Sequence, residues 1–153
     1  MASVAVSAAV ATYALDYDLE AVLPFVQRFL TGLARSDGMR AIGLRRNGDL
    51  VAGAVFEGFN GQNVWVHIAA VPGARWLNRD FLRACFVYAF RVCAVRRVSG
   101  YVDESNLAAR RFDEHLGFRE EARLCGAAPD GGDVIVYVMW RQDCRFLEGL
   151  RHG

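Results

Sequence analysis

The sequence predicts one α/β domain, in which a central, mostly antiparallel sheet contains one parallel pair of strands and is flanked by helices. The chain has 153 residues, of which 54% are hydrophobic and 23% charged, as is typical of one globular core. Asn47-Gly48 separates two strand-like runs and is well suited to a tight hairpin. A helical pattern joins the strand-like runs 63–70 and 98–103, and such a crossover makes two strands parallel. We expect the domain to span residues 1–153, with its core at about 38–141.

The first 33 residues predict a strand followed by a helix. Residues 1–15 carry valines among alanines and have no arginine ahead of the apolar part, which favours an opening strand over a secretion signal. Asp16 or Asp18 can cap the helix that follows, because apolar residues recur at helical spacing from Leu19 to Leu33.

Three antiparallel strands are expected next. They span residues 39–46, 50–57 and 63–70 and are joined by two turns that contain asparagine and glycine. Because alternate residues of a strand point to opposite faces, Trp65 and His67 share one face of the third strand.

The pattern turns helical again after Pro72. Asn78 can cap a helix whose apolar residues repeat with a helical period up to Cys93. This helix is apolar almost all round, so we expect it to lie against the sheet and also to contact a second element or a partner. The strand 98–103 follows.

The last third of the chain predicts one more helix and a hairpin. Asn106 can cap a short helix, and Gly117 lies where a left-handed C-cap is needed. Strands are expected at 119–127 and 133–141, on either side of a Pro-Asp-Gly-Gly turn. Residues 142–153 are expected to form a short helical or frayed tail.

The composition excludes several kinds of protein. The sequence contains no lysine, so its 18 basic residues other than histidine are all arginine, and Schiff-base chemistry and P-loop nucleotide hydrolysis are excluded. A net charge of +1 disfavours nonspecific nucleic-acid binding, and no apolar stretch is long enough to span a membrane. The four cysteines show no zinc-site spacing, so we expect no metal and reduced thiols in the cytoplasm.

A local motif adds to the order of the elements. Residues 106–118 read Asn-Leu-Ala-Ala-Arg-Arg-Phe-Asp-Glu-His-Leu-Gly-Phe. This run resembles the N-x-x-A-x-x-(apolar)-x-x-x-L-G-F signature of the GCN5-related N-acetyltransferase (GNAT) superfamily, and the order of elements from about 38 to 141 is similar as well. The resemblance implies a GNAT-like acyl-CoA N-acyltransferase fold, with acetyl-CoA as co-substrate.

The resemblance also implies where acetyl-CoA binds. In the family the two parallel strands splay apart, and the pantetheine arm pairs with the backbone of the first of them as an additional strand would. The pyrophosphate lies at the N-terminus of the following helix, where free N–H groups and the helix dipole favour an anion. A helix-start asparagine contacts the pantetheine arm. The expected cofactor-binding residues are therefore Ile68, Ala69, Ala70, Arg75, Asn78, Arg79 and Asn106.

The helix start departs from the family pattern. The family usually carries Q/R-x-x-G-x-G/A there, whereas this sequence reads Arg75-Trp-Leu-Asn78-Arg79-Asp80 and has neither glycine. Glycine lets the backbone approach a phosphate closely, and the Asp80 carboxylate would repel one unless it points away. Arg75 and Arg79 are expected to compensate by direct phosphate contacts.

Catalysis in the family needs a base for the amine and a proton donor for the departing thiolate. A histidine on the first splayed strand is an attractive base, because imidazole titrates near neutrality. The position that often holds the family's tyrosine donor is an aspartate here, so another phenol would have to substitute. The catalytic candidates are His67, Tyr101 and Asp113, with Glu57, Tyr137 and the pair Asp103-Glu104 as alternatives.

We therefore expect an N-acetyltransferase that moves an acetyl group from acetyl-CoA to a primary amine of a small molecule or peptide, by direct attack in a ternary complex. One alternative is a GNAT-like interaction module without CoA binding, which the lost glycines and the missing tyrosine favour. The other is a nucleobase-modifying enzyme similar to the Mom-type relatives, for which the arginines are the only support. Nucleic acid and membranes are not expected partners, and a homodimer is a candidate assembly.

Overall fold

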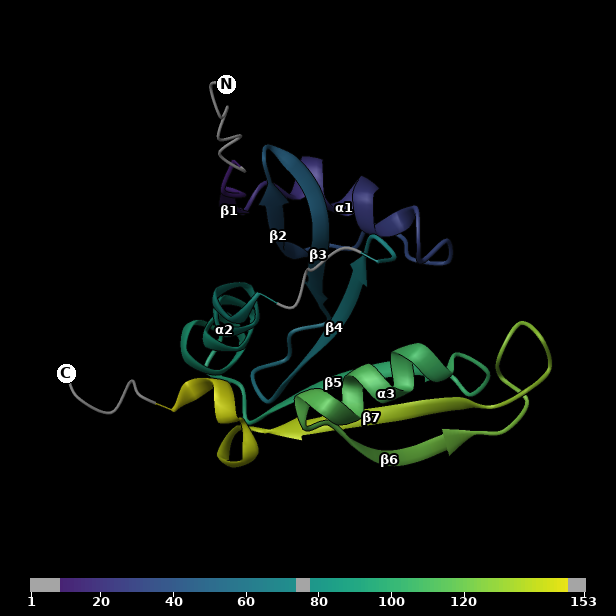
Figure 1. Ribbon diagram of the computed structural model, residues 1–153. Helices are drawn as coiled ribbons and strands as arrows, with labels where there is room; N and C mark the ends of the chain where they lie inside the picture. The colour runs from purple at the N-terminus through teal and green to yellow at the C-terminus, as the bar shows by residue number, and fades with distance from the viewer. Residues whose placement is uncertain (1–8, 74–77, 149–153) are drawn as a thin grey trace, which may run out of the picture.

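The computed structural model describes residues 9–73 and 78–148 of the chain, and these residues form one seven-stranded sheet in the order β1-β2-β3-β4-β5-β7-β6. Figure 1 shows α1 beside the upper strands, while α2 and α3 lie in front of the sheet. The elements are β1 (Tyr13–Asp16), α1 (Leu19–Gln27), β2 (Arg40–Arg46), β3 (Asp49–Glu57), β4 (Asn63–Ala70), α2 (Arg79–Val87), the π-helical turn η1 (Tyr88–Val92), β5 (Arg97–Asp103), α3 (Leu107–Leu116), β6 (Arg119–Leu124), β7 (Val134–Trp140) and the 3₁₀ turns η2 (Arg141–Asp143) and η3 (Arg145–Leu147).

The hairpin of β2 and β3 turns at the predicted asparagine and glycine. Asn47 and Gly48 have φ values of 50° and 88°, and a two-residue turn with both residues in the left-handed region matches the twist of the strands that it joins. β2, β3 and β4 are antiparallel neighbours. The three consecutive antiparallel strands are therefore confirmed.

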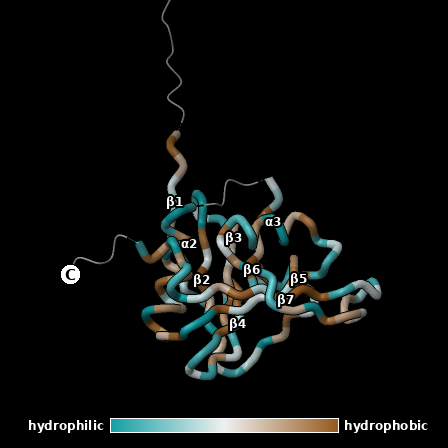
Figure 2. The backbone as a smooth tube through the Cα atoms, turned by 90° about the horizontal axis from the view of Figure 1, so that it is seen from below, coloured by the Kyte–Doolittle hydropathy of each residue, from teal (hydrophilic) through white to brown (hydrophobic). Residues whose placement is uncertain are grey.

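Because successive side chains of a strand point to opposite faces, the sheet has a hydrophobic core on each face. On one face, Phe81 and Phe86 of α2 belong to a cluster with Ala54 and Val66. On the other face, residues of α1 pack against Val55 and the strand residues that share its face. In Figure 2 the central strands carry much of the hydrophobic colour, whereas the segment ahead of β1 projects from the body. The two helical layers thus lie on opposite sides of β4.

The C-terminal turns cover the second apolar side of α2. Phe146 of η3 stacks on Phe86 with ring centroids 5.0 Å apart. The prediction that this helix contacts a second element besides the sheet is confirmed, and that element belongs to the same chain. Helical structure continues from α2 through η1 to Val92, where Cys93 N–H donates to the Tyr88 carbonyl across 2.8 Å.

Three predicted elements have different bounds. The opening strand begins only at Tyr13; Val10 is 91% exposed, and residues 1–8 lie outside the described residues. The first helix ends at Gln27 instead of Leu33, because the Gln27 amide donates to the Leu33 carbonyl across 2.9 Å and the chain turns back while still burying Leu33. β6 ends at Leu124, because Gly126 turns at a φ of 69° and donates to Asp133.

β4 and β5 are parallel over only a short length. They pair at Asn63–Arg97, Val64–Val98 and Trp65–Ser99, and then diverge, as Figure 1 shows. At the closed end, buried Ser99 donates to Asn63 across 2.5 Å and accepts from Arg97 across 3.0 Å. The predicted parallel pair is confirmed, and beyond it β4 stays with β3 while β5 stays with β7.

Close packing of α1 on β3 requires a glycine. A Cβ at Gly53 would lie 2.9 Å from Val22 Cγ1 and from Val26 Cγ2. We expect Gly53→Ala to lower the free energy of unfolding by about 1–3 kcal/mol through overpacking, measured by urea denaturation. Gly32→Ala is the control, because nothing lies within 4 Å of the added methyl group, and it should change stability by less than about 1 kcal/mol. Equal stability of the two variants would contradict this packing.

Candidate active site

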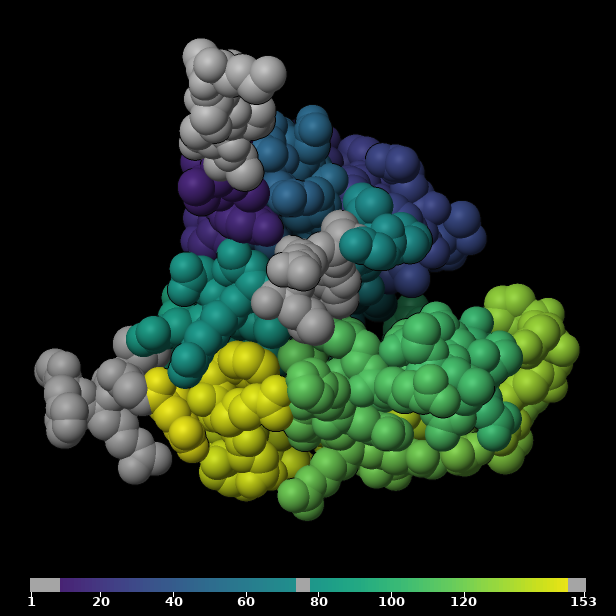
Figure 3. Space-filling view, in the orientation of Figure 1, coloured from purple at the N-terminus to yellow at the C-terminus, as the bar shows by residue number. Residues whose placement is uncertain are grey.

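A cavity of about 450 Å³ lies where β4 and β5 diverge. Its walls come from both strands, from α3, from residues 29–33 after α1, and from the loop around Pro129. Figure 3 shows a hollow between the upper body and the layer that contains α3. Because α1 and α3 lie on opposite faces of the sheet, the cavity is reached by residues from both faces.

The β5-facing edge of β4 lines this gap. After Trp65, residues 66–70 have no strand partner on that side among the described residues, although they remain paired to β3 on the other side. Peptide groups at such an edge need a partner or water. A pantetheine arm, which carries two amide groups, fits this edge as an additional strand would. Ile68 lines the cavity, whereas the Ala69 side chain lies in the α1 core, so Ala69 and Ala70 could contribute through their backbone.

His67 is held by a carboxylate on the neighbouring strand. Its Nε2 lies 2.7 Å from Glu57 Oε1, and the other Glu57 oxygen accepts from the Ser36 hydroxyl at 2.8 Å. The His67 side chain is only 6% exposed but lines the cavity. With Nε2 committed to Glu57, Nδ1 has no hydrogen bond within the described residues and is not sealed in the core. This arrangement fixes the ring and leaves one nitrogen available for a proton.

Tyr101 projects from β5 onto the same face as His67. Its ring makes edge contacts with the rings of His67 and Trp65, at centroid distances of 5.4 and 6.1 Å. Removal from water raises the pKa of the Tyr101 phenol, and the nearby Glu57 and Asp103 carboxylates add to the rise. The phenol therefore stays protonated at neutral pH and can donate a hydrogen bond into the cavity that it lines.

Asp113 reaches the cavity from α3, on the other face of the sheet. Burial raises the pKa of its carboxyl from 3.8 to about 7, and the adjacent Glu114 carboxylate adds to the rise. An aspartate with this pKa is partly protonated at neutral pH. It can therefore act as a proton donor at the position where the family resemblance places a tyrosine.

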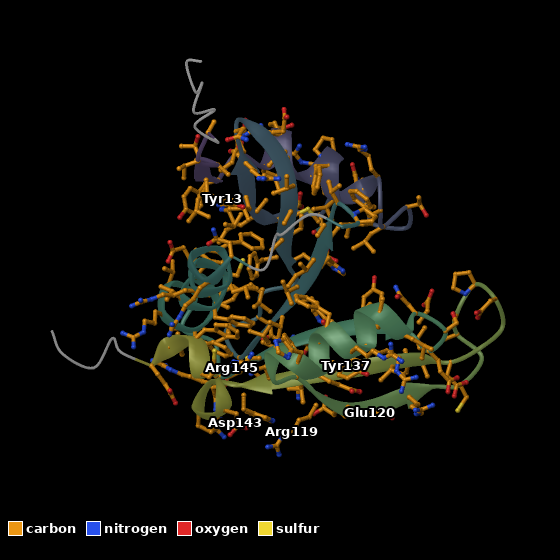
Figure 4. All side chains as sticks on the ribbon, viewed as in Figure 1. Tyr13, Arg119, Glu120, Tyr137, Asp143 and Arg145 are labelled. Atoms are coloured by element: carbon orange, nitrogen blue, oxygen red, sulfur yellow. The ribbon has the colours of Figure 1, made fainter. Side chains whose placement is uncertain are left out.

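The residues predicted as catalytic alternatives differ in their position relative to the cavity. Tyr137 does not line the cavity: it is fully buried and its hydroxyl donates to Glu114 across 3.1 Å, and Figure 4 shows it beside α3. Asp103 does line the cavity, while Glu104 forms an ion pair with Arg123 at 2.7 Å. Glu57 is the alternative that the structure places in contact with His67, as its partner.

The start of α2 differs from a free anion-binding helix terminus. The Asn78 side chain caps it and accepts from the N–H groups of Asp80 and Phe81, at 2.8 and 3.1 Å. These donors are therefore occupied by the chain itself. Arg79 is exposed at the first helical position, and the predicted Arg75 lies outside the described residues.

The start and end of α3 match the motif. Asn106 caps the helix by accepting from Ala109 N–H at 3.1 Å, and it also lines the cavity. Gly117 has a φ of 110°, and Phe118 N–H donates back to the Asp113 carbonyl, which is a Schellman-type end. The motif thus fixes the helix that carries Asn106 and Asp113.

Some residues of the site escaped the sequence analysis. Ser36 and residues 29–33 lie in a connection without a recognisable motif, so the contacts of its individual residues were not predictable from the sequence. The contact of Glu57 with His67 could have been found by counting residues outward from the turn at 58–61, which places the two side chains on one face of a hairpin. Arg83, His115 and Arg145 line a second pocket beside α2 and were also missed.

No group of three or more histidine, cysteine, aspartate or glutamate side chains among the described residues could hold a metal ion. No helix among these residues is long and apolar enough to cross a membrane. The four cysteines are unpaired.

Comparisons with known proteins give matches at the level of structure. No protein-family model matches the chain, and no curated protein matches its sequence. A mutant of the spermidine N-acetyltransferase SpeG from Vibrio cholerae superposes with a TM-score of 0.72 at 14% identity, covering 89% of this chain and 96% of that one. A dodecameric structure of the enzyme from the same organism gives 0.68 at 15%, covering 85% and 94%. These likenesses confirm the predicted GNAT-like fold.

The raised pKa of Asp113 has a consequence for stability. Because the folded-state pKa of about 7 exceeds the ordinary 3.8, the stability associated with the protonated carboxyl is fully present below 3.8 and is lost as pH rises through about 7. We expect the free energy of unfolding of the native protein to fall over this range relative to that of Asp113→Asn, measured by urea denaturation. Parallel pH profiles, or an NMR titration of Asp113 near its ordinary value, would contradict the assignment.

Proposed function

We propose that this protein is an N-acetyltransferase that transfers the acetyl group of acetyl-CoA to a primary amine. The observation that carries the proposal is the cavity in the β4/β5 gap, which brings together a carboxylate-bound histidine from one face of the sheet and a carboxyl group of raised pKa from the other. The structural likeness to spermidine N-acetyltransferases supports it.

The chain's own groups suggest how the co-substrate would be held. The free edge of residues 66–70 would pair with the pantetheine amides, and Asn106 at the start of α3 would contact the same arm. Arg79, together with Arg75, would meet the phosphates, since the first N–H groups of α2 are occupied by Asn78. Acetyl-CoA supplies an acyl thioester to the cavity.

Three residues would take up or donate the protons of the transfer. His67 Nδ1 accepts a proton from the amine, directly or through a water molecule, and Glu57 stabilises the resulting imidazolium through Nε2–H. The amine nitrogen forms a bond to the acetyl carbon while the carbon–sulfur bond breaks. Asp113 donates its proton to the departing sulfur, with Tyr101 as a second donor at the same cavity. Direct attack of this kind requires both substrates to be bound together.

The lining of the cavity favours a particular class of amine. Asp103 and Asp113 are its carboxyl groups, and none of the described residues that line it is an arginine. A carboxylate or phosphate on the acceptor would find no cationic partner there except His67, whereas a second ammonium group would find Asp103. We propose a small acceptor with no anionic group; the spermidine acetyltransferase neighbours support a polyamine.

The surroundings of the enzyme are part of the proposal. Four unpaired cysteines fit a reducing compartment such as the cytoplasm. One structural neighbour is described as dodecameric, which supports self-association of this chain, as a homodimer or a larger assembly.

The test of the function is calorimetry followed by a turnover assay. Acetyl-CoA should bind, and release of free CoA thiol should require both acetyl-CoA and an amine. Spermidine should be turned over at least tenfold faster than glutamate at equal concentration, since the glutamate carboxylates would meet Asp103. Binding of acetyl-CoA without turnover of any amine would contradict the proposed acetyltransferase activity. Absence of acetyl-CoA binding would favour the alternative of an interaction module.

The role of His67 has its own test. His67→Gln should lower kcat by about 10²–10⁴ with little change in the affinity for acetyl-CoA, and Glu57→Gln should lower it less, because Glu57 acts on the proton only through the His67 ring. Tyr137→Phe is the matched control and should keep its kcat, because Tyr137 does not line the cavity. A His67→Gln variant with native kcat would show that the proton leaves by another route.

A further inference from the structure

A second pocket, of about 330 Å³, lies outside the β4/β5 cavity. Three segments that are distant in sequence form it: the first turns of α2, the last turn of α3 and the C-terminal turn η3. Leu82 and Leu116 are its buried apolar residues, and both are at most 5% exposed. Figure 4 shows Arg145 on the C-terminal segment beside α2 and the end of α3.

The charged side chains of this pocket are mostly cationic. Arg79, Arg83 and Arg145 line it together with His115, against the single carboxylate of Glu148. The chain as a whole is nearly neutral, with a net charge of +1, so this is a local excess. Three guanidinium groups gathered around one hollow repel each other unless an anion lies between them.

These arginines are free to bind a ligand. Elsewhere in the described residues, arginines such as Arg45 and Arg97 form ion pairs with carboxylates. Within residues 9–73 and 78–148, the guanidinium groups of the pocket's arginines form no ion pair and no hydrogen bond, although that of Arg145 lies 5.0 Å from the centre of the Phe146 ring. Planar guanidinium groups match the oxygens of phosphate, and a phosphate monoester is largely a dianion at neutral pH. The pocket therefore suits a phosphomonoester.

Its position relates it to the proposed co-substrate. Arg79 is the first residue of α2, the helix start to which we assign the pyrophosphate, and the same residue also lines the pocket. The 3′-phosphate of CoA is separated from the pyrophosphate by a single ribose. Because the Asn78 side chain already accepts from the N–H groups of Asp80 and Phe81, side chains supply most of the positive charge for phosphate near this helix start.

We propose that the pocket formed by Arg79, Arg83, His115 and Arg145 binds the 3′-phosphate of CoA. The inference rests on the proposed function and adds to it a site that ties the C-terminal turn η3 to co-substrate recognition. The protein should therefore distinguish CoA from 3′-dephospho-CoA, which keeps the pantetheine arm and the pyrophosphate.

Calorimetry with the full chain tests this. The native protein should bind CoA at least about tenfold more tightly than 3′-dephospho-CoA, because several charge-assisted hydrogen bonds are lost with the phosphate. Arg145→Ala and Arg83→Ala should each weaken CoA binding by about tenfold and leave the affinity for 3′-dephospho-CoA unchanged. Arg46→Ala is the matched control: Arg46 is an exposed arginine at the end of β2 and lines neither pocket, so both affinities should stay native.

The outcomes separate the two proposals. If the native protein binds both ligands equally, or if the variants weaken both equally, the 3′-phosphate site is wrong while the proposed function stands. If neither ligand binds, the proposed function fails. Inorganic phosphate is the further probe: competition with CoA that disappears in Arg145→Ala supports the pocket, whereas phosphate binding at this pocket in the presence of saturating CoA would overturn it.

Discussion

The short parallel pairing of β4 and β5 is the constraint on which the site depends. The two strands share three residue pairs, and then each continues with its other neighbour. Asn63, Ser99 and Arg97 fix the closed end through a partly buried chain of hydrogen bonds, which Arg97 extends to Glu121 of β6. Because that end is fixed, the opening has a defined place and width, and the free edge of β4 is presented to it.

The opening also explains why residues from both faces of one sheet can act on the same small volume. A continuous sheet would separate His67, on the face of α1, from Asp113, on the face of α2 and α3. The gap joins the two faces. A base on one face and an acid on the other can therefore stay apart while the base reaches the attacking amine and the acid reaches the departing sulfur. Their surroundings differ accordingly: His67 is paired with Glu57, and Asp113 is kept partly neutral by burial.

Local signals in the sequence predict most of this fold. The left-handed pair Asn47-Gly48 sets the first hairpin, and Asn106 and Gly117 set the ends of α3, because each of these residues acts through its own backbone or its nearest neighbours. The early end of α1 was not predictable, because the apolar spacing continues to Leu33 and only the Gln27 side chain turns the chain back. The loop after β6 is also longer than expected, because β6 ends where Gly126 N–H donates to the Asp133 side chain, and the sequence pattern does not show this contact.

Sequence reasoning reached the site only in part, because strand alternation gives the face of a side chain but not its contacts. His67, Tyr101 and Asp113 all line one cavity, yet the link from Ser36 through Glu57 to His67 needs the register of β3 on β4. The grouping of Arg83 and Arg145 with Arg79 was not predictable from the sequence, because only the tertiary fold brings these distant segments together.

Amide hydrogen exchange with and without acetyl-CoA tests the central claim most directly, namely that the free edge of β4 binds the co-substrate arm. We expect slower exchange in residues 66–70 when acetyl-CoA is bound, because their unpaired N–H groups gain partners, and unchanged exchange in residues 43–46 of β2, which are paired on both sides. Binding of acetyl-CoA that leaves exchange in residues 66–70 unchanged would contradict it.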